Sequence, residues 1–320
     1  MKKVTPRDPL IEKIIQATDQ KELEKRALFE LLSTADVVYL SEKHDNPRHH
    51  KIQLEVLQEL VKKGKKPAVG FEFFFREQTG YLMDYIQGKP SPFMGKSKAH
   101  TPGKVLRAKL GWQHRSDDDW GYYYQLIELA KKHNLVLFGT DLSPAMTLRI
   151  RRYGLEKLSR FERSQLGTTS FENKAYETMM LQRFKSAHCG MGSPSFLKPF
   201  YEAWLARNDS MAFAISDMTA EVDGPVVVIV GAGHTRNNMG VVERVAHLKP
   251  NLKQVNLGLT EVWQEGSALE AYLEGEQVDD VKFGPAHDFF WFTDRVDSVD
   301  HCEKFKAQIQ KMKSKSKSEK

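Results

Sequence analysis

Apolar and polar residues alternate along this chain in blocks that predict strands and helices in turn. Nearly unbroken apolar runs of strand length are typical of strands that are buried on both sides. Six such runs occur, at residues 36–40 (DVVYL), 67–74 (PAVGFEFF), 135–142 (LVLFGTDL), 224–234 (GPVVVIVGAGH), 253–259 (KQVNLGL) and 288–294 (DFFWFTD).

Amphipathic stretches fill the intervals between these runs. Apolar residues recur with helical spacing over residues 10–34, 49–66 and 120–134, and residues 144–218 form a long region of helical character. Strands separated by helices are typical of a largely parallel sheet that is covered on both faces. We therefore predict an α/β fold with a central, mostly parallel sheet, helices on both faces, and a helical insertion between the third and fourth strands.

One segment interrupts this alternation. Residues 88–119 are rich in Pro, Gly, Ser and Lys and predict a loop-rich excursion. Because the strands on either side share one alternation, we expect a single α/β domain over residues 1–305. Residues 306–320 end in QKMKSKSKSEK, a composition typical of a basic, disordered tail.

The net charge of +6 and the isoelectric point near 9.0 depend strongly on this tail. Against Glu319 alone, the tail carries Lys311, Lys313, Lys315, Lys317 and Lys320. The rest of the chain is only mildly basic, so we expect no nucleic-acid partner. We also expect that the tail makes a weak contact with an anionic membrane surface.

The cysteines and the N-terminus bear on the compartment. Cys189 and Cys302 allow one disulfide without implying it. No apolar run approaches the length of a membrane span, and the basic start MKKVTPRDPLIEKIIQ is not followed by the apolar stretch of a signal peptide. A full-length chain of this kind is expected in the cytoplasm.

Acidic and histidine side chains follow four of the predicted strands. Glu42 and His44 follow the first, Glu72 ends the second, Asp141 follows the third and His234 follows the fourth. The carboxyl ends of parallel strands share one edge of a sheet, where open α/β folds bind ligands. We therefore expect Glu42, His44, Glu72 and His234 to converge on one cleft.

Neighbouring residues have plainer interpretations. His49 and His50 are expected to face solvent in the first turn of a helix, with Asn46 as its N-cap and Pro47 as its first residue.

The glycine-rich turn GAGHTRNNMG lacks the acidic partner of a dinucleotide site. Gly231 and Gly233 would instead let the backbone approach a bound ligand closely.

Two chemistries remain open for the four converging side chains. Imidazoles with carboxylates suit a divalent metal such as zinc, and they also suit metal-free acid–base work. The pKa of His44 or His234 should lie above 6.5 unless burial outweighs the carboxylates. Replacement of His234 by Ala should cost no more than about 1 kcal/mol of stability and weaken ligand binding at least roughly tenfold.

Five motifs carry a resemblance to a known family. They are SEKHDNPRHHKIQ, GFEFFFREQ, LGWQHRSDDDWGYYYQLIELAKKHNL, AHCGM with FYEAWLARNDSMAFAI, and VVVIVGAGHTRNNMGV. Their order resembles that of ChaN-like haem-binding proteins, which are related to the Tiki and TraB proteins and to erythromycin esterase. The resemblance extends from about Pro9 to about Phe305.

The motifs match position by position, with two departures. The Gly-Glu-x-His turn of the family corresponds to residues 41–44, its acidic strand end to Glu72, and its Gly-x-x-His to residues 231–234. Ser41 replaces the usual glycine. A serine would be strained if this turn required a positive φ. The paired histidine of the family appears as His188 followed by Cys189, so one imidazole is replaced by a potential thiolate.

The resemblance implies a haem-binding protein of haem and iron acquisition, more in keeping with binding than with catalysis. It further implies a homodimer that brings two haems together and a lipoprotein that faces the periplasm. The residues assigned to the haem on this basis are His44, His188, His234, Gly231, Gly233 and Arg236.

The rival is a hydrolase of the metalloprotease or esterase kind. In it, His44 and His234 would act beside Glu42 and Glu72, either as ligands of a metal such as zinc or as activators of water.

Overall fold

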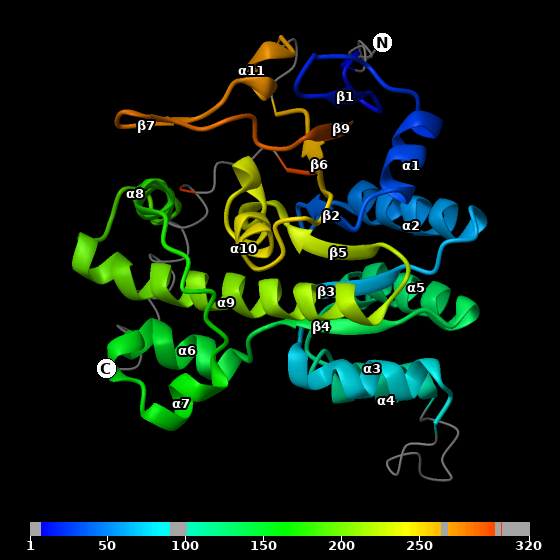
Figure 1. Cartoon of the computed structure of the whole chain (residues 1–320), viewed down its shortest axis with the longest axis horizontal. Helices are drawn as coiled ribbons and strands as arrows, with labels where there is room; N and C mark the ends of the chain where they lie inside the picture. The colour runs from blue at the N-terminus through cyan, green and yellow to red at the C-terminus, as the bar shows by residue number, and fades with distance from the viewer. Residues whose placement is uncertain (1–7, 90–100, 264–267, 298–301, 303–320) are drawn as a thin grey trace, which may run out of the picture.

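Seven strands form one mixed sheet in the computed structural model, which describes residues 8–89, 101–263, 268–297 and 302. The strand order is β1-β9-β6-β2-β5-β3-β4 (Figure 1). Every neighbouring pair is parallel except β1 with β9. The strands are β1 (Ile14–Gln16), β2 (Val37–Glu42), β3 (Ala68–Phe75), β4 (Leu137–Asp141), β5 (Val226–Gly231), β6 (Gln254–Glu261) and β9 (Phe289–Thr293). A separate hairpin joins β7 (Gln277–Val278) and β8 (Val281–Lys282).

Side chains of the central strands point alternately to two apolar layers. Val38 and Leu40 of β2 pack in the layer formed with α1 (Lys25–Ser33), α2 (Pro47–Lys62), α3 (Thr79–Ile86), α4 (Pro102–Lys109) and α5 (Asp117–His133). Val37 and Tyr39 pack in the opposite layer, with α9 (Pro194–Glu221) and α10 (Val241–Leu248). The unbroken apolar runs are thus explained, because each strand is buried on both faces.

The predicted α/β fold, with helices on both faces of a mostly parallel sheet, is confirmed. The expected helical insertion lies between β4 and β5 and ends in α9, a long helix that packs along β4 (Figure 1). Before α9 it contains α6 (Pro144–Tyr153), α7 (Arg160–Gln165) and α8 (Lys174–Ala187). The remaining helix, α11 (Glu270–Leu273), is a single turn near the hairpin.

Two sequence-based assignments were wrong in part. The helix expected over residues 10–34 begins only at Lys25, because Ile14–Gln16 instead pairs antiparallel with β9 as an edge strand. The loop-rich excursion at 88–119 contains α4 and the start of α5. The tail at 306–320 lies outside the described residues.

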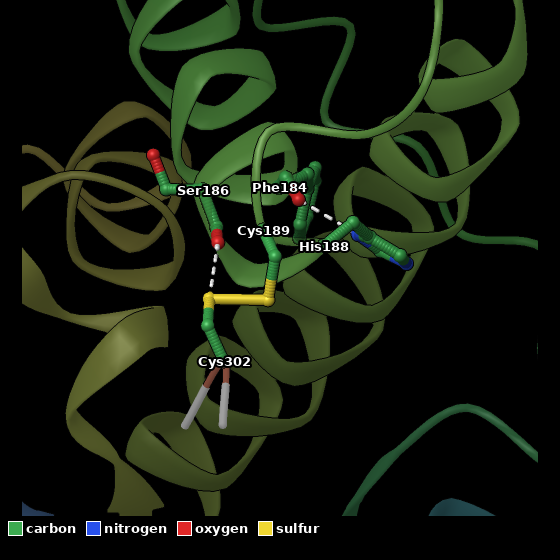
Figure 2. Close-up of a disulfide and its surroundings, with 5 residues drawn as sticks. All are labelled: Phe184, Ser186, His188, Cys189 and Cys302. Atoms are coloured by element: carbon green, nitrogen blue, oxygen red, sulfur yellow. Dashed lines mark hydrogen bonds between the residues drawn. A yellow bond between two sulfur atoms is a disulfide. The ribbon is translucent and has the colours of Figure 1, made fainter. Parts of the chain in front are cut away.

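A disulfide joins Cys189, which follows α8, to Cys302 (Figure 2). The sequence left this bridge open, and the suggested thiolate at Cys189 is therefore wrong. The bond closes a loop of 113 residues in sequence separation. In the described part of the chain, no helix combines the length and apolar character needed to cross a bilayer.

Candidate functional site

Residues at the carboxyl ends of four parallel strands meet at one edge of the sheet. Glu42 ends β2, directly opposite Gly231 at the end of β5, while Glu72 lies in β3 and Asp141 ends β4. Together with four side chains from other elements, the three acidic residues form what we call the His44 cluster, defined as Glu42, His44, Glu72, Asp141, Arg207, His234 and Tyr123.

Glu42 is buried and accepts hydrogen bonds from several elements. His44 Nδ1 lies 2.9 Å from its Oε1, which also accepts the Tyr123 hydroxyl from α5. Gln53 of α2 donates to the other oxygen, and His50 Nδ1 lies 3.3 Å from it. Burial alone would raise the pKa of Glu42, but the His44 hydrogen bond and the nearby His50 together hold it below its usual value.

His44 is the accessible member of the cluster. Its side chain is 45% exposed, and its ring lies edge-on to Phe73 with the centroids 4.5 Å apart. Burial of part of the ring would lower its pKa, but the Glu42 hydrogen bond and the charge of Glu72 raise it above 6.5. His44 is therefore a well-oriented imidazole that gains a proton more readily than a free histidine.

Arg207 joins the two carboxylates on the far side of the cluster. From α9, its guanidinium donates to Asp141 Oδ2 at 2.7 and 2.9 Å and to Glu72 Oε1 at 2.8 Å. Burial opposes ionisation of Glu72, yet its contact with His234 and the charges of Arg207 and His44 hold its pKa well below its usual value. Burial dominates at Asp141, whose pKa rises to about 6 despite Arg207.

His234 is far more constrained than the sequence suggested. It is 2% exposed, and its ring stacks on Trp204 of α9 with the centroids 3.7 Å apart. Nδ1 lies 2.6 Å from Asn208 Oδ1, and Nε2 lies 3.3 Å from Glu72 Oε1. Burial outweighs the Glu72 charge and lowers its pKa to about 4. The expectation that His234 contributes little to packing was wrong, because α9 covers the strand end.

Glycine at position 231 allows this convergence. A Cβ at Gly231 would lie 2.6 Å from His44 Cε1 and 3.1 Å from Glu72 Oε2, and the Gly231 amide donates to the same Glu72 oxygen at 2.6 Å. A Cβ at Gly233 would meet the Trp204 ring at 3.1 Å. Both glycines thus make room for protein side chains.

The first turn of α2 differs from expectation in one respect. Asn46 is the N-cap, since its side chain accepts the Arg48 amide at 2.9 Å, and Pro47 is the first helical residue, as predicted. His49 and His50 are both fully buried, whereas the sequence placed them in solvent. His50 bonds the backbone oxygen of His44 at 2.9 Å and therefore fixes the turn that carries it.

Three residues of interest lie outside the cluster. His188 caps the end of α8, where Nδ1 lies 2.7 Å from Phe184 O and the ring meets Phe196 and Phe200 edge-on. Arg236 lies in the short turn η4 (Arg236–Asn238), near Glu276.

Ser41 is an extended residue within β2, so the strain anticipated for a non-glycine residue does not arise. Its hydroxyl instead bonds Thr235 and Asn256.

The donor set of the His44 cluster does not favour a metal ion. No group of three or more His, Cys, Asp or Glu side chains is arranged to hold one among the residues described here. The carboxylate oxygens of Glu42 and Glu72 already accept hydrogen bonds, and the Arg207 cation occupies the space between Glu72 and Asp141. A dication there would face a fixed positive charge.

Sequence reasoning missed Arg207, Tyr123 and Gln53. Arg207 had a readable signal, because a charged residue within a helix whose neighbouring positions are mostly apolar needs a buried partner. Tyr123 and Gln53 lie on helix faces whose orientation toward Glu42 depends on tertiary packing.

Two cavities with aromatic walls lie near the His44 cluster. One, of about 420 Å³, is called the Trp112 cavity and is lined by Glu72 and Asp141 with Phe73, Phe75, Trp112 and Arg115. The other, of about 330 Å³, is called the His287 cavity and lies beside the ends of β2, β5 and β6. Its lining includes Lys43, Arg236, Trp263, Tyr272, His287 and Phe290.

A match to a family model shows that this chain is a member of the Tiki superfamily. The family model described as haem-binding uptake, Tiki superfamily, ChaN matches residues 28–245. The chain belongs to this family. The resemblance carried by the five sequence motifs is thereby confirmed, and no curated protein matches the chain.

Among solved structures, ChaN of Campylobacter jejuni, described with cofacial haem binding, is similar over 87% of this chain and 95% of its own. Its identity is 18% and its TM-score 0.61. A mutant erythromycin esterase in its open conformation has 12% identity over 88% of this chain and 99% of its own, with a TM-score of 0.47. These likenesses concern the fold.

Proposed function

We propose that this protein binds haem and takes part in haem and iron acquisition. Membership of the haem-binding uptake family supports the proposal. A haem site needs flat apolar walls, one or two axial ligands, and cations or polar groups for the propionates.

The observation that carries the proposal is the make-up of the two cavities. Phe73, Phe75 and Trp112 wall one of them, and the Arg115 guanidinium lies 5.3 Å from the Trp112 ring centroid. The other combines Trp263, Tyr272 and Phe290 with the cations Lys43 and Arg236. Both cavities therefore offer aromatic walls and a positive charge beside the carboxyl edge of the sheet.

The three histidines first proposed as axial ligands differ in their access. His234 is enclosed between Trp204, Asn208 and Glu72. His188 lies beside the disulfide at the end of α8 (Figure 2). His44 alone among these three is both in the cluster and open to solvent, although Glu42 and Glu72 favour its protonated form.

Titration of the purified protein with haem, followed by absorbance, tests the proposal. We expect a saturable Soret band, with zinc titrated in parallel as the test of a metal site. Addition of haem without a change from the spectrum of free haem would refute the proposed function. Sedimentation of the same samples with and without haem tests the proposed homodimer.

The disulfide supports a compartment that permits oxidation, in keeping with a protein that faces the periplasm. Thiol counting in denaturant, with and without prior reduction, measures the bridge in protein from its own host. We expect no reactive thiol before reduction and two after it. Two thiols before reduction would contradict the proposed compartment.

Hydrolysis is a second candidate, favoured by the pairing of His44 with Glu42. A carboxylate that holds Nδ1 of an exposed imidazole orients its Nε2 for acid–base work. The test is turnover of a small activated ester by the protein and by His44→Ala. Turnover that is equal in the two proteins, or absent from both, would remove this candidate.

A further inference from the structure

The His287 cavity contains a buried histidine that none of the sequence motifs includes. His287 precedes β9 and is 5% exposed, and its ring packs on the backbone of Gly258 in β6. A Cβ at Gly258 would lie 2.0 Å from the imidazole, so only glycine leaves room for the ring there. The position of His287 is therefore fixed by the sheet itself.

Hydrogen bonds determine which ring nitrogen of His287 carries the proton. The side-chain amide of Asn256 donates to Thr235 O and to Asn238 Oδ1, both at 2.8 Å. Asn256 Oδ1 is therefore the acceptor, and it accepts the Ser41 hydroxyl at 2.9 Å and lies 3.0 Å from His287 Nδ1. Nδ1 must donate in this pair, because an oxygen acceptor offers no proton.

The other ring nitrogen is left with a free lone pair. Burial, reinforced by the positive charge of Arg236, lowers the pKa of His287 to about 3, so the imidazole is neutral near pH 7. No residue in the described part of the chain makes a hydrogen bond to Nε2, and this atom is not among the fully enclosed polar atoms that lack a partner, whereas His234 Nε2 is. A neutral imidazole whose Nδ1–H is held by an oxygen is the arrangement that metal-ligating histidines adopt.

The surroundings of His287 favour haem over a free metal ion. A protein site for zinc needs three or four ligands, and none of the described residues form such a group. Haem iron already has four pyrrole nitrogens and needs only one or two ligands from the protein. Trp263, Tyr272 and Phe290 supply aromatic walls, and Glu261 and Glu274 also line the cavity. The half-exposed Lys43 and Arg236 lie 3.1 Å from Glu261 and 4.0 Å from Glu276, so haem propionates would take these cations over from carboxylates of the chain.

We propose that His287 Nε2 is the axial ligand of a haem bound in the His287 cavity, with Arg236 and Lys43 as partners of its propionates. This inference rests on the haem binding proposed above. It assigns Ser41 and Asn256 as positioning residues, because their hydrogen bonds fix the ring and its tautomer. It also separates the ligand from the His44 cluster.

The experiment compares haem titrations of the wild-type chain, His287→Ala and His44→Ala, with the exposed His114→Ala as the matched control. We expect His287→Ala to shift the Soret band and to weaken haem binding at least about tenfold. Added imidazole should restore the wild-type spectrum, a rescue that a merely structural role would not give. The control His114→Ala should keep the wild-type spectrum and affinity.

Other results would overturn the inference. Wild-type spectrum and affinity in folded His287→Ala, or their loss in His44→Ala instead, would move the ligand elsewhere. Should His287→Ala not fold, His287→Gln, which keeps an amide donor for Asn256, is titrated in its place, and an unchanged spectrum and affinity in that variant would equally move the ligand elsewhere. A wild-type protein that binds no haem at all would refute the proposed function itself.

Discussion

The His44 cluster and the His287 cavity place the same side chain in opposite electrostatic settings. At His44, Nδ1 faces the Glu42 carboxylate, and Glu72 adds a second negative charge. At His287, Nδ1 faces the neutral amide oxygen of Asn256 in a buried wall. The pKa of His44 is raised, whereas that of His287 falls to about 3.

Burial and the partner at Nδ1 together set the chemistry available at Nε2 in each site. A carboxylate partner favours the imidazolium form, which suits the transfer of protons. An amide partner in a buried site keeps the ring neutral, with a lone pair for a metal. The two regions therefore favour different imidazole chemistries, although Ser41 and Glu42 are consecutive residues of β2.

The largest expected effect is a loss of stability when the ion pairs of the His44 cluster are broken. Arg207→Ala removes the cation between Glu72 and Asp141 and leaves two buried carboxylates facing each other. We expect a loss of about 3–5 kcal/mol in the free energy of unfolding, measured by urea denaturation near pH 7.

The control for Arg207 is Lys13→Ala, which breaks the exposed pair with Glu22 and should cost less than about 1 kcal/mol. Equal losses in the two variants would show that the carboxylates of the cluster do not depend on Arg207.

His234→Ala tests whether the buried histidine of the cluster is structural. Loss of its stacking on Trp204 and of its bond to Asn208 should cost about 2–4 kcal/mol. The exposed His114→Ala should stay within about 0.5 kcal/mol. Haem binding per folded molecule should not change. A large loss of haem affinity in His234→Ala would show that the His44 cluster takes part in haem binding.

The sequence predicted the strand ends of the His44 cluster but not the residues that lock them. Glu42, Glu72 and Asp141 could be placed because an apolar run shows where a buried strand stops. Arg207 could not, since it is 66 residues from Asp141 and reaches it only through the packing of α9 on β4. The same packing turned His234 from an expected half-exposed residue into a buried one.

The His287 cavity was beyond prediction for a related reason. His287 precedes β9, whereas Asn256 and Gly258 both belong to β6, and they meet only through the pairing of β6 with β9. A single buried histidine has no spacing pattern to recognise. The edge strand β1 was missed similarly, because its three residues gain strand structure only from β9.

Acidification tests whether the folded protein keeps the His287 ring neutral. Since the pKa of His287 is about 3 in the folded protein and near 6.5 when unfolded, the unfolded chain binds the proton first as the pH falls. The free energy of unfolding should therefore decrease below pH 6.5, by about 2 kcal/mol at pH 5 for this one group.

The measurement is the change in unfolding free energy between pH 7 and pH 5, in wild-type protein and in His287→Gln. The variant keeps an amide donor for Asn256 but cannot titrate, so it should lose about 2 kcal/mol less than wild type over this range. Equal losses would show that the His287 ring is not held neutral.

The smallest effect is a change of pKa at one residue with the fold intact. Glu42→Gln replaces the carboxylate at His44 Nδ1 by an amide and so gives His44 the kind of partner that His287 has. Because the Glu42 hydrogen bond and charge raise the pKa of His44, that pKa should fall, and NMR titration of the ring protons measures it. The imidazole of His287 should stay neutral over the same range. A pKa of His44 that stays raised in Glu42→Gln would assign the effect to Glu72, and the rule that the Nδ1 partner decides the charge would fail for this site.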